Sequence, residues 1–188
     1  MREEDAEQTD AHALPERRMI EYKIAGNLKI LFVGINPHPG SYRRHVPFSN
    51  NKTFWYLLNR AGLLNEDENE LRTDSGLKKM YDQRFMQRYR LGFVNLVDRP
   101  TVQVTKLRKG EEKPGVARLL KDVRTCRPKV ICFIGKVTYN VFRGSRECGY
   151  GWQESIDGAR VFVMHFPIRG PAAIRIRELR EMNEAGRG

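Results

Sequence analysis

The sequence has few cysteines, few histidines and no long apolar run, and each shortage excludes a class of protein. Cys126, Cys132 and Cys148 include no CxxC pair, which excludes a disulfide framework and is typical of small buried side chains in a reducing compartment. The histidines show no HxH or HxxxH spacing, so we expect no metal site. No apolar run approaches the ~20 residues that span a bilayer. The first residues, MREEDAEQTD, are acidic and polar, so we expect neither a membrane segment nor a signal peptide.

The motifs of several common enzyme classes are also absent. The chain contains no P-loop, no GxGxxG and no GxSxG sequence. This excludes the nucleotide-dependent enzymes and the serine hydrolases that carry those motifs. A small-molecule hydrolase whose positive charge has no functional role would need a nucleophile motif or a general-base motif, and the sequence has neither. We therefore expect no cofactor.

What the sequence has in excess is positive charge. Its 188 residues hold 34 Lys and Arg against 23 Asp and Glu, a net charge of +11, which points to a polyanionic partner. The charge is unevenly spread: residues 1–21 carry −4, whereas residues 84–129 carry +9. We expect a disordered acidic tail over 1–17. The remainder, 18–188, suits a single domain with its own core, because it shows no repeat and no low-complexity linker.

Four short apolar runs read as buried parallel strands, and five amphipathic segments lie between or after them. We predict strands at 28–34, 91–97, 129–135 and 160–164, and helices at 53–61, 77–89, 116–123, 136–142 and 172–182. Strands that alternate with helices of this length predict a three-layer α/β/α fold with a central, mainly parallel four-stranded sheet. Ligands of such sheets bind at the carboxyl ends of the strands, so the loops that follow them are the places to look for a site.

The loop after the first strand reads GINPHPGSYRRHVPF and holds two glycines and three prolines, which indicates a stiff, specially shaped turn. Asn36 stands just past the strand end. Its amide can hold a water molecule or a substrate carbonyl, but it is not a strong base. On composition alone, a structural Asn-Pro turn and a functional asparagine remain equally open.

The segment GINPHPGSYRRHVPF…FW, followed by GFVNLVDRPT at 92–101, resembles the mismatch-specific uracil/thymine-DNA glycosylases of the uracil-DNA glycosylase superfamily. The resemblance covers about 28–170. It implies a three-layer α/β fold and hydrolysis of the N-glycosidic bond of uracil or thymine mispaired with guanine, and of some damaged or hypoxanthine-type bases. It also implies double-stranded DNA with a mismatched or deaminated base as the partner, a monomeric protein without metal, and a location in the cytoplasm or nucleoid, or in a eukaryotic nucleus.

Four residues of this first loop correspond to functional positions of the family. The resemblance implies that Asn36 holds the attacking water and that the backbone at Ile35 lines the base pocket. It implies that Phe48 stacks on the flipped base. Ser41 falls near the position that faces C5 of the base, although an ordinary loop serine is the commoner alternative.

The second motif places Asn95 at the end of the second strand, where the resemblance implies a hydrogen bond to the base or to the first motif. A satisfied strand-end amide is an equal alternative. For Asp98 and Arg99 we favour a salt-bridged turn.

The chain departs from the family after the fourth strand, where relatives carry a Pro/Ser/Gly-rich loop that opens with Asn, His or Met. Either His165 or Phe166 takes the opening position. His165 is the chemically apt choice as a catalytic residue, because imidazole can donate a hydrogen bond to the base or to a phosphate. Ile168, Arg169 and Gly170 would form the wedge that fills the space left by the base.

Further DNA contacts are expected from His38, Arg43 and Arg44, although exposed loop histidines, His45 included, usually have no such role. Residues 106–113 either track the DNA backbone or form a solvated hairpin tip.

The first motif has no lysine at the nucleophile position, so we expect a monofunctional enzyme that does not cleave the strand. Replacing Asn36 by Ala should nearly abolish excision, and replacing it by Asp should retain or raise it. The alternative is a DNA-binding module of the same fold that is catalytically weak or inactive.

Overall fold

The structure is a computed structural model that describes residues 20–145 and 147–188. The predicted acidic tail over 1–17 lies outside the described residues. Cys126 and Cys132 are buried and Cys148 is half-buried, and all three are free thiols.

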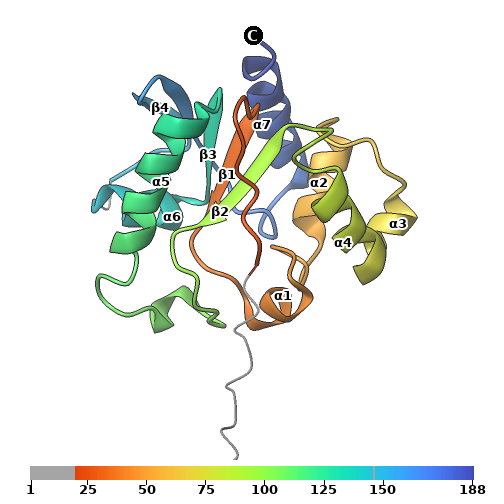
Figure 1. Cartoon of the computed structure of the whole chain (residues 1–188), viewed down its shortest axis with the longest axis horizontal. Coiled ribbons are helices and arrows are strands. Elements are labelled where there is room, and N and C mark those ends of the chain that lie inside the picture. The colour runs from red at the N-terminus through yellow and green to blue at the C-terminus, as the bar shows by residue number, and fades with distance from the viewer. Residues whose placement is uncertain (1–19, 146) are drawn as a thin grey trace, which may run out of the picture.

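A single five-stranded sheet forms the centre of the molecule (Figure 1), with the strand order β2-β1-β3-β5-β4. The parallel strands are β1 (Ile30–Gly34), β2 (Leu91–Asn95), β3 (Val130–Ile134) and β5 (Ala159–Met164). The predicted fold class and its four parallel strands are thus confirmed, but the strand count was one too low. The missed strand is β4 (Gly151–Ile156), which pairs antiparallel with β5 at the sheet edge. Its sequence, GWQESI, keeps polar residues exposed and therefore lacks the apolar run of a buried strand.

Helices cover both faces of the sheet, as Figure 1 shows. Because side chains alternate along each strand, the sheet contributes to two separate hydrophobic clusters, one on each face. One face carries α5 (Lys113–Cys126) and α6 (Lys136–Arg143). The other carries α2 (Thr53–Arg60), α3 (Glu68–Arg72), α4 (Asp74–Gln83) and α7 (Ala172–Ala185).

Two short helical segments lie in the loops after β1 and β2, and the sequence did not indicate them. They are α1 (Pro39–Arg44) and a 3₁₀ turn over Val104–Lys106. The prediction of a helix over 77–89 was too long, because α4 ends at Gln83 and the chain continues in turns. Three loops leave the carboxyl ends of the strands: residues 35–48 after β1, 96–112 after β2 and 165–171 after β5.

Candidate functional site

The side chain of Asn36 is held in one orientation by the loop after β2. Its Nδ2 donates to Oγ1 of Thr101 at 2.7 Å, to the carbonyl of Arg99 at 3.2 Å and to that of Pro37 at 3.3 Å. Backbone carbonyls only accept hydrogen bonds, so the amide nitrogen must face them and the amide oxygen must face away. Among the described residues, no group donates to that oxygen. It is therefore left to accept a hydrogen bond from a bound molecule.

Thr101 and Arg99 form a support for Asn36 that the sequence analysis missed. The buried Thr101 hydroxyl donates to the carbonyl of Gln103 at 2.8 Å, and the Thr101 amide donates to the carbonyl of Pro37 at 3.1 Å. The Arg99 guanidinium makes two hydrogen bonds to the Glu111 carboxylate, at 2.5 and 2.7 Å, and thereby lowers the pKa of that carboxyl to about 2. The only signal in the sequence was the DRPT motif, which does not show what its threonine contacts.

Phe48 has an unusual backbone conformation. Its φ of 54° lies in the left-handed region, which a bulky side chain rarely adopts. The half-buried ring packs against Phe54, with centroids 4.7 Å apart, and edge-on against Phe93 at 6.0 Å. A left-handed backbone conformation is strained for a bulky residue such as phenylalanine. Backbone strain of this kind persists only where surrounding contacts impose it, and it is concentrated at functional sites.

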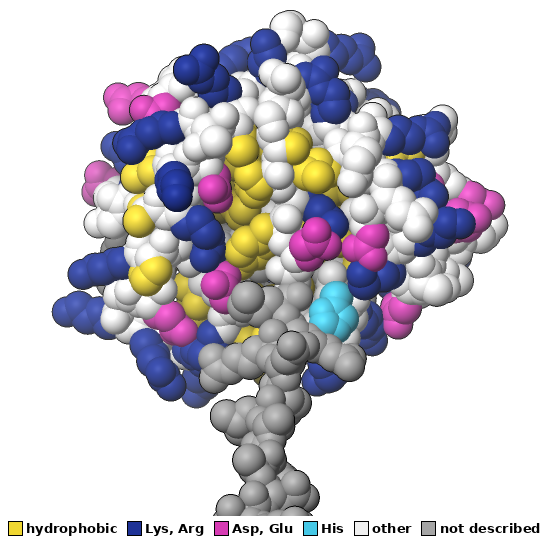
Figure 2. Space-filling view, in the orientation of Figure 1, with side chains coloured by type: hydrophobic (Ala, Val, Ile, Leu, Met, Phe, Trp, Pro, Cys, Tyr) yellow, Lys and Arg dark blue, Asp and Glu magenta, His cyan; other side chains and the backbone are white. Residues whose placement is uncertain are grey.

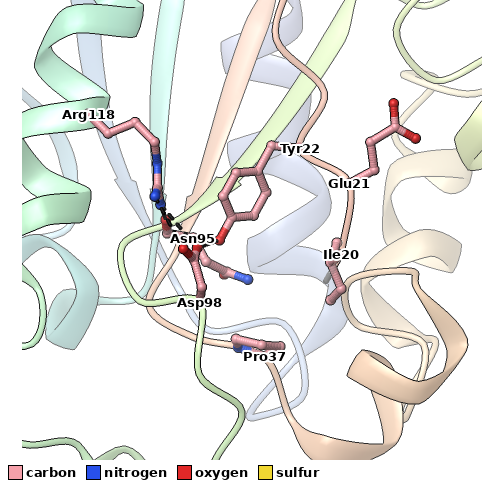
Figure 3. Close-up of a pocket in the computed structure, with 7 residues that line it drawn as sticks. All are labelled: Ile20, Glu21, Tyr22, Pro37, Asn95, Asp98 and Arg118. Atoms are coloured by element: carbon pink, nitrogen blue, oxygen red, sulfur yellow. Dashed lines mark hydrogen bonds and ion pairs between the residues drawn. The ribbon is translucent and has the colours of Figure 1, made fainter. Parts of the chain in front are cut away.

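Asn95 lies at the carboxyl end of β2 and faces a cavity of about 400 Å³. Figure 3 shows its amide directed toward the side of the cavity formed by Ile20 and Pro37. The residue is only 3% exposed, and no described residue forms a hydrogen bond with its side chain. A Cβ at position 34 would lie 2.4 Å from Oδ1 of Asn95, so a larger residue there would displace the Asn95 side chain.

The wall of this cavity is a polar cluster of Tyr22, Asp98 and Arg118 (Figure 3). The Tyr22 hydroxyl donates to Asp98, and burial together with this bond raises the pKa of the phenol. The Arg118 guanidinium donates to Asp98 at 3.2 Å and to the carbonyl of Asn95 at 2.8 Å. Asp98 and Arg99 both form ion pairs, but the expected salt-bridged turn is absent among the described residues, because Asp98 pairs with Arg118 of α5 and Arg99 pairs with Glu111 of the loop after β2.

His165 and Phe166 point to different places. The His165 ring stacks on Tyr150, with centroids 3.5 Å apart, and its Nδ1 lies 2.5 Å from Oε1 of Glu178. The Phe166 ring instead packs edge-on against Phe48, with centroids 6.4 Å apart. Of the two residues that compete for the opening position of this loop, Phe166 is therefore the one that joins the aromatic group around Phe48.

The proposed wedge residues form the exposed end of the loop after β5. A turn runs from Phe166 to Arg169, whose amide donates to the Phe166 carbonyl at 3.4 Å. Ile168 lies within this turn and is 45% exposed. Gly170 has a φ of +79°, a conformation that favours glycine.

Several first-loop residues have local structural contacts. His38 caps α1, because its Nδ1 accepts a hydrogen bond from the Gly40 amide at 3.0 Å. The buried Ser41 hydroxyl accepts one from the Asn50 amide, also at 3.0 Å. Arg44 pairs with Asp74 at 3.0 Å. The side chain of Arg43 is exposed. The backbone of Ile35 is held by the loop after β2, because its carbonyl accepts a hydrogen bond from the Val97 amide at 2.8 Å.

The basic stretch 84–129 does not form one surface, and only part of it lies near Asn36. Arg90 and Lys129 immediately precede β2 and β3, at the amino ends of the strands and opposite to Asn36. Lys106 and Lys109 lie in the loop that also supports Asn36. Figure 2 shows Lys and Arg side chains around most of the rim of the visible face, and not gathered in one patch.

Two absences hold for the described residues. No group of three or more His, Cys, Asp or Glu side chains in residues 20–145 and 147–188 is placed to hold a metal ion. Within the same residues, no helix combines the length and the apolar character required to cross a membrane.

A family model described as the uracil DNA glycosylase superfamily matches residues 22–180. The match extends from the cavity wall at Tyr22 into α7. It therefore includes all three loops at the carboxyl ends of the strands.

Proposed function

The chain belongs to the uracil DNA glycosylase superfamily, and on this premise we propose that it is a monofunctional DNA glycosylase that excises uracil mispaired with guanine from duplex DNA. Thymine, hypoxanthine and other damaged bases are further substrates to test. The observation that carries the proposal is the fixed amide of Asn36, whose Nδ2 donates to three acceptors while its oxygen has no donor among the described residues.

In the proposed reaction, the amide oxygen of Asn36 accepts a hydrogen bond from the attacking water. The bond between C1′ and the base nitrogen breaks with its electron pair on the base, the water oxygen bonds to C1′, and the proton that this water then releases neutralises the departed base, directly or through solvent. An amide orients water without deprotonating it, so catalysis comes from placement of the water and from stabilisation of the cationic sugar and the leaving base. The supports from Thr101 and Arg99 keep this orientation fixed before substrate binds.

The base must leave the helix before it reaches Asn36. Extrusion costs a few kcal/mol and is cheapest for a mismatched base, which favours G·U pairs as substrates. In the proposed complex, Phe48 stacks on the flipped base and Asn95 forms hydrogen bonds to its edge. The left-handed backbone of Phe48 supports the first role, and the buried amide of Asn95, which has no side-chain partner in residues 20–145 and 147–188, supports the second. In the same complex, the Ile168 side chain fills the space that the extruded base leaves between its neighbours in the DNA.

One observation favours a second candidate, a DNA-binding module with weak or no excision. The loop after β5 exposes the apolar side chains of Phe166 and Ile168, while Nδ1 of its only histidine is bound to Glu178. If Nε2 of His165 does not reach the base or a phosphate, this loop contributes little to the stabilisation of the leaving base.

Alkali-revealed nicking of labelled duplexes separates the two candidates. The panel contains G·U, G·T, A·U, hypoxanthine and ethenocytosine, and each is incubated with excess wild-type protein, Asn36→Ala and Asn65→Ala. Asn65 is an exposed asparagine whose side chain has no hydrogen-bond partner among the described residues, so its substitution is the matched control. We expect excision by wild type and by Asn65→Ala, and nearly none by Asn36→Ala. Binding without excision of any base would contradict the glycosylase and support the binding module.

A further inference from the structure

Two charged side chains of α7 hold the loop after β5, and both are buried. Arg175 is 4% exposed and Glu178 is 6% exposed. A buried charge is costly unless hydrogen bonds or an opposite charge compensate it. Within the described residues, Arg175 has no carboxylate partner at ion-pair distance, and its guanidinium bonds to neutral carbonyls only. Well-packed apolar side chains often stabilise a buried position as well as charged ones do, so stability alone does not account for the two charges.

Arg175 ties together the two ends of the turn that carries Ile168. Its Nε donates to the Phe166 carbonyl at 2.7 Å, and its Nη1 donates to the Pro171 carbonyl at 2.8 Å. Gly170 leaves room for this contact, because a Cβ at that position would lie only 3.3 Å from the guanidinium. The planar fork of arginine suits two such acceptors, whereas a lysine ammonium is a point charge.

Glu178 fixes the first residue of the same loop. Its Oε2 accepts a hydrogen bond from the His165 amide at 3.0 Å, and its Oε1 lies 2.5 Å from the His165 Nδ1. Tyr150 stacks on one face of the imidazole. With His165 held in this way, the next residue, Phe166, lies against Phe48.

We propose that Arg175 and Glu178 are positioning residues for base extrusion, a role that rests on the proposed function. They hold residues 165–171 in the conformation in which the Phe166 ring packs against Phe48 and the Ile168 side chain extends into solvent. A loop that inserts into the base stack loses conformational entropy on binding unless it is already ordered. A loop that is ordered before it contacts DNA therefore favours the extruded base over the stacked one. The two residues touch neither water nor sugar in the proposed reaction, so they act on extrusion and not on hydrolysis.

The test compares two substrates that differ only in the cost of extrusion. One duplex carries uracil opposite guanine, and the other carries uracil opposite an abasic analogue, where no base pair is broken. With enzyme in excess, we expect Arg175→Lys to lower the excision rate on G·U about tenfold, the loss that corresponds to one charge-assisted hydrogen bond. On the unpaired uracil we expect less than about a threefold loss, because extrusion there costs little.

The matched control is Arg177→Lys, an exposed position of the same helix that should leave both rates unchanged. Glu178→Ala should show the same selective loss as Arg175→Lys. Equal losses on the two substrates, or no loss on either, would overturn the proposal. Thermal unfolding identifies a variant that does not fold. Gly170→Ala then replaces Arg175→Lys, because it disturbs the same contact from the loop and predicts the same selective loss.

A fluorescence measurement separates this proposal from the proposed function. A 2-aminopurine next to the target uracil brightens when the uracil leaves the stack. If wild-type protein excises no base but brightens the probe, and Arg175→Lys brightens it less, the reaction is wrong and the positioning role stands. If both proteins give the same signal, the positioning role is wrong.

Discussion

Asn36 and Thr101 lie 65 positions apart in the sequence, and in the structure the Asn36 Nδ2 donates to the Thr101 hydroxyl at 2.7 Å. The hydroxyl proton is directed to the Gln103 carbonyl at 2.8 Å, so the Thr101 oxygen presents a lone pair to Asn36. This contact makes the Asn36 nitrogen a donor on one side, and on the other side no residue in the described part of the chain donates to the Asn36 oxygen. The orientation of the amide therefore depends on a residue outside its own motif.

Replacing Thr101 by Val should slow excision without a comparable loss of stability. Valine has the same shape but cannot accept from Asn36, so we expect a rate about tenfold lower under single-turnover conditions. Thr101→Ser keeps the hydroxyl and should stay near wild type. A wild-type rate for Thr101→Val on G·U would contradict the support assigned to this residue.

The structure changes the expectation for Asn36→Asp. An aspartate would place a carboxylate oxygen opposite the carbonyls of Pro37 and Arg99, where only a donor fits. We now expect excision of uracil at least about tenfold slower than wild type, and not the retained or raised rate suggested by the sequence. Rates at several pH values on a G·U duplex test this, because a protonated carboxyl could restore one donor at low pH.

Phe48 and Phe54 are in contact, yet their substitution should have different effects. Stacking of a base on an aromatic ring is worth about 1–3 kcal/mol, so Phe48→Ala should slow excision or weaken binding about 10- to 100-fold. Phe54 is fully buried, and Phe54→Ala should lower the free energy of unfolding by about 3–5 kcal/mol. Single-turnover rates and denaturant unfolding of both variants provide the comparison. An unimpaired Phe48→Ala variant would remove the stacking role.

The Arg99–Glu111 pair should make stability depend on pH in the acidic range. Arg99 lowers the pKa of Glu111 from its ordinary value of 4.5 to about 2. A depressed pKa gives a stabilisation that is complete above the ordinary value and is lost as the pH falls toward the folded-state value. The melting temperature of wild type should therefore exceed that of Glu111→Gln at neutral pH, and the difference should shrink as the pH falls from 4.5 to about 2. A difference independent of pH would argue against the pair.

The basic residues of 84–129 lie at two opposite ends of the sheet, and we expect only those near Asn36 to contact DNA. Each phosphate contact contributes ~0.9 to the slope of log K against log salt. Lys109→Gln, in the loop beside Asn36, should reduce the magnitude of the slope by about that amount. Arg90→Gln, at the opposite end of the sheet, should leave it unchanged. Fluorescence anisotropy at several salt concentrations measures both slopes, and a larger change for Arg90→Gln would reverse the assignment of the DNA-binding face.

The parts of the fold that the sequence predicted were those built from local patterns. The runs LKILFVG, LGFVNLV, KVICFIG and RVFVM are mostly apolar because both faces of the sheet are covered along these parallel strands, and all four runs became strands. The edge strand β4 was missed because its exposed face admits polar residues. The long helix predicted over 77–89 ended early at Gln83, where propensity alone gave no stop signal.

The sequence by itself determined the fold class, and it predicted a site at the carboxyl edge of the sheet with Asn36, Phe48 and Asn95, because buried strands and short motifs are local signals. Tertiary structure decided the orientation of Asn36 through Thr101 and the choice of Phe166 over His165 as the neighbour of Phe48. It also divided the basic stretch between two ends of the molecule. Helix α5 alone has 14 residues and covers about 21 Å at 1.5 Å per residue. Basic residues that are close in the sequence therefore lie far apart in the structure, because a helix or strand crosses the whole domain between one loop and the next.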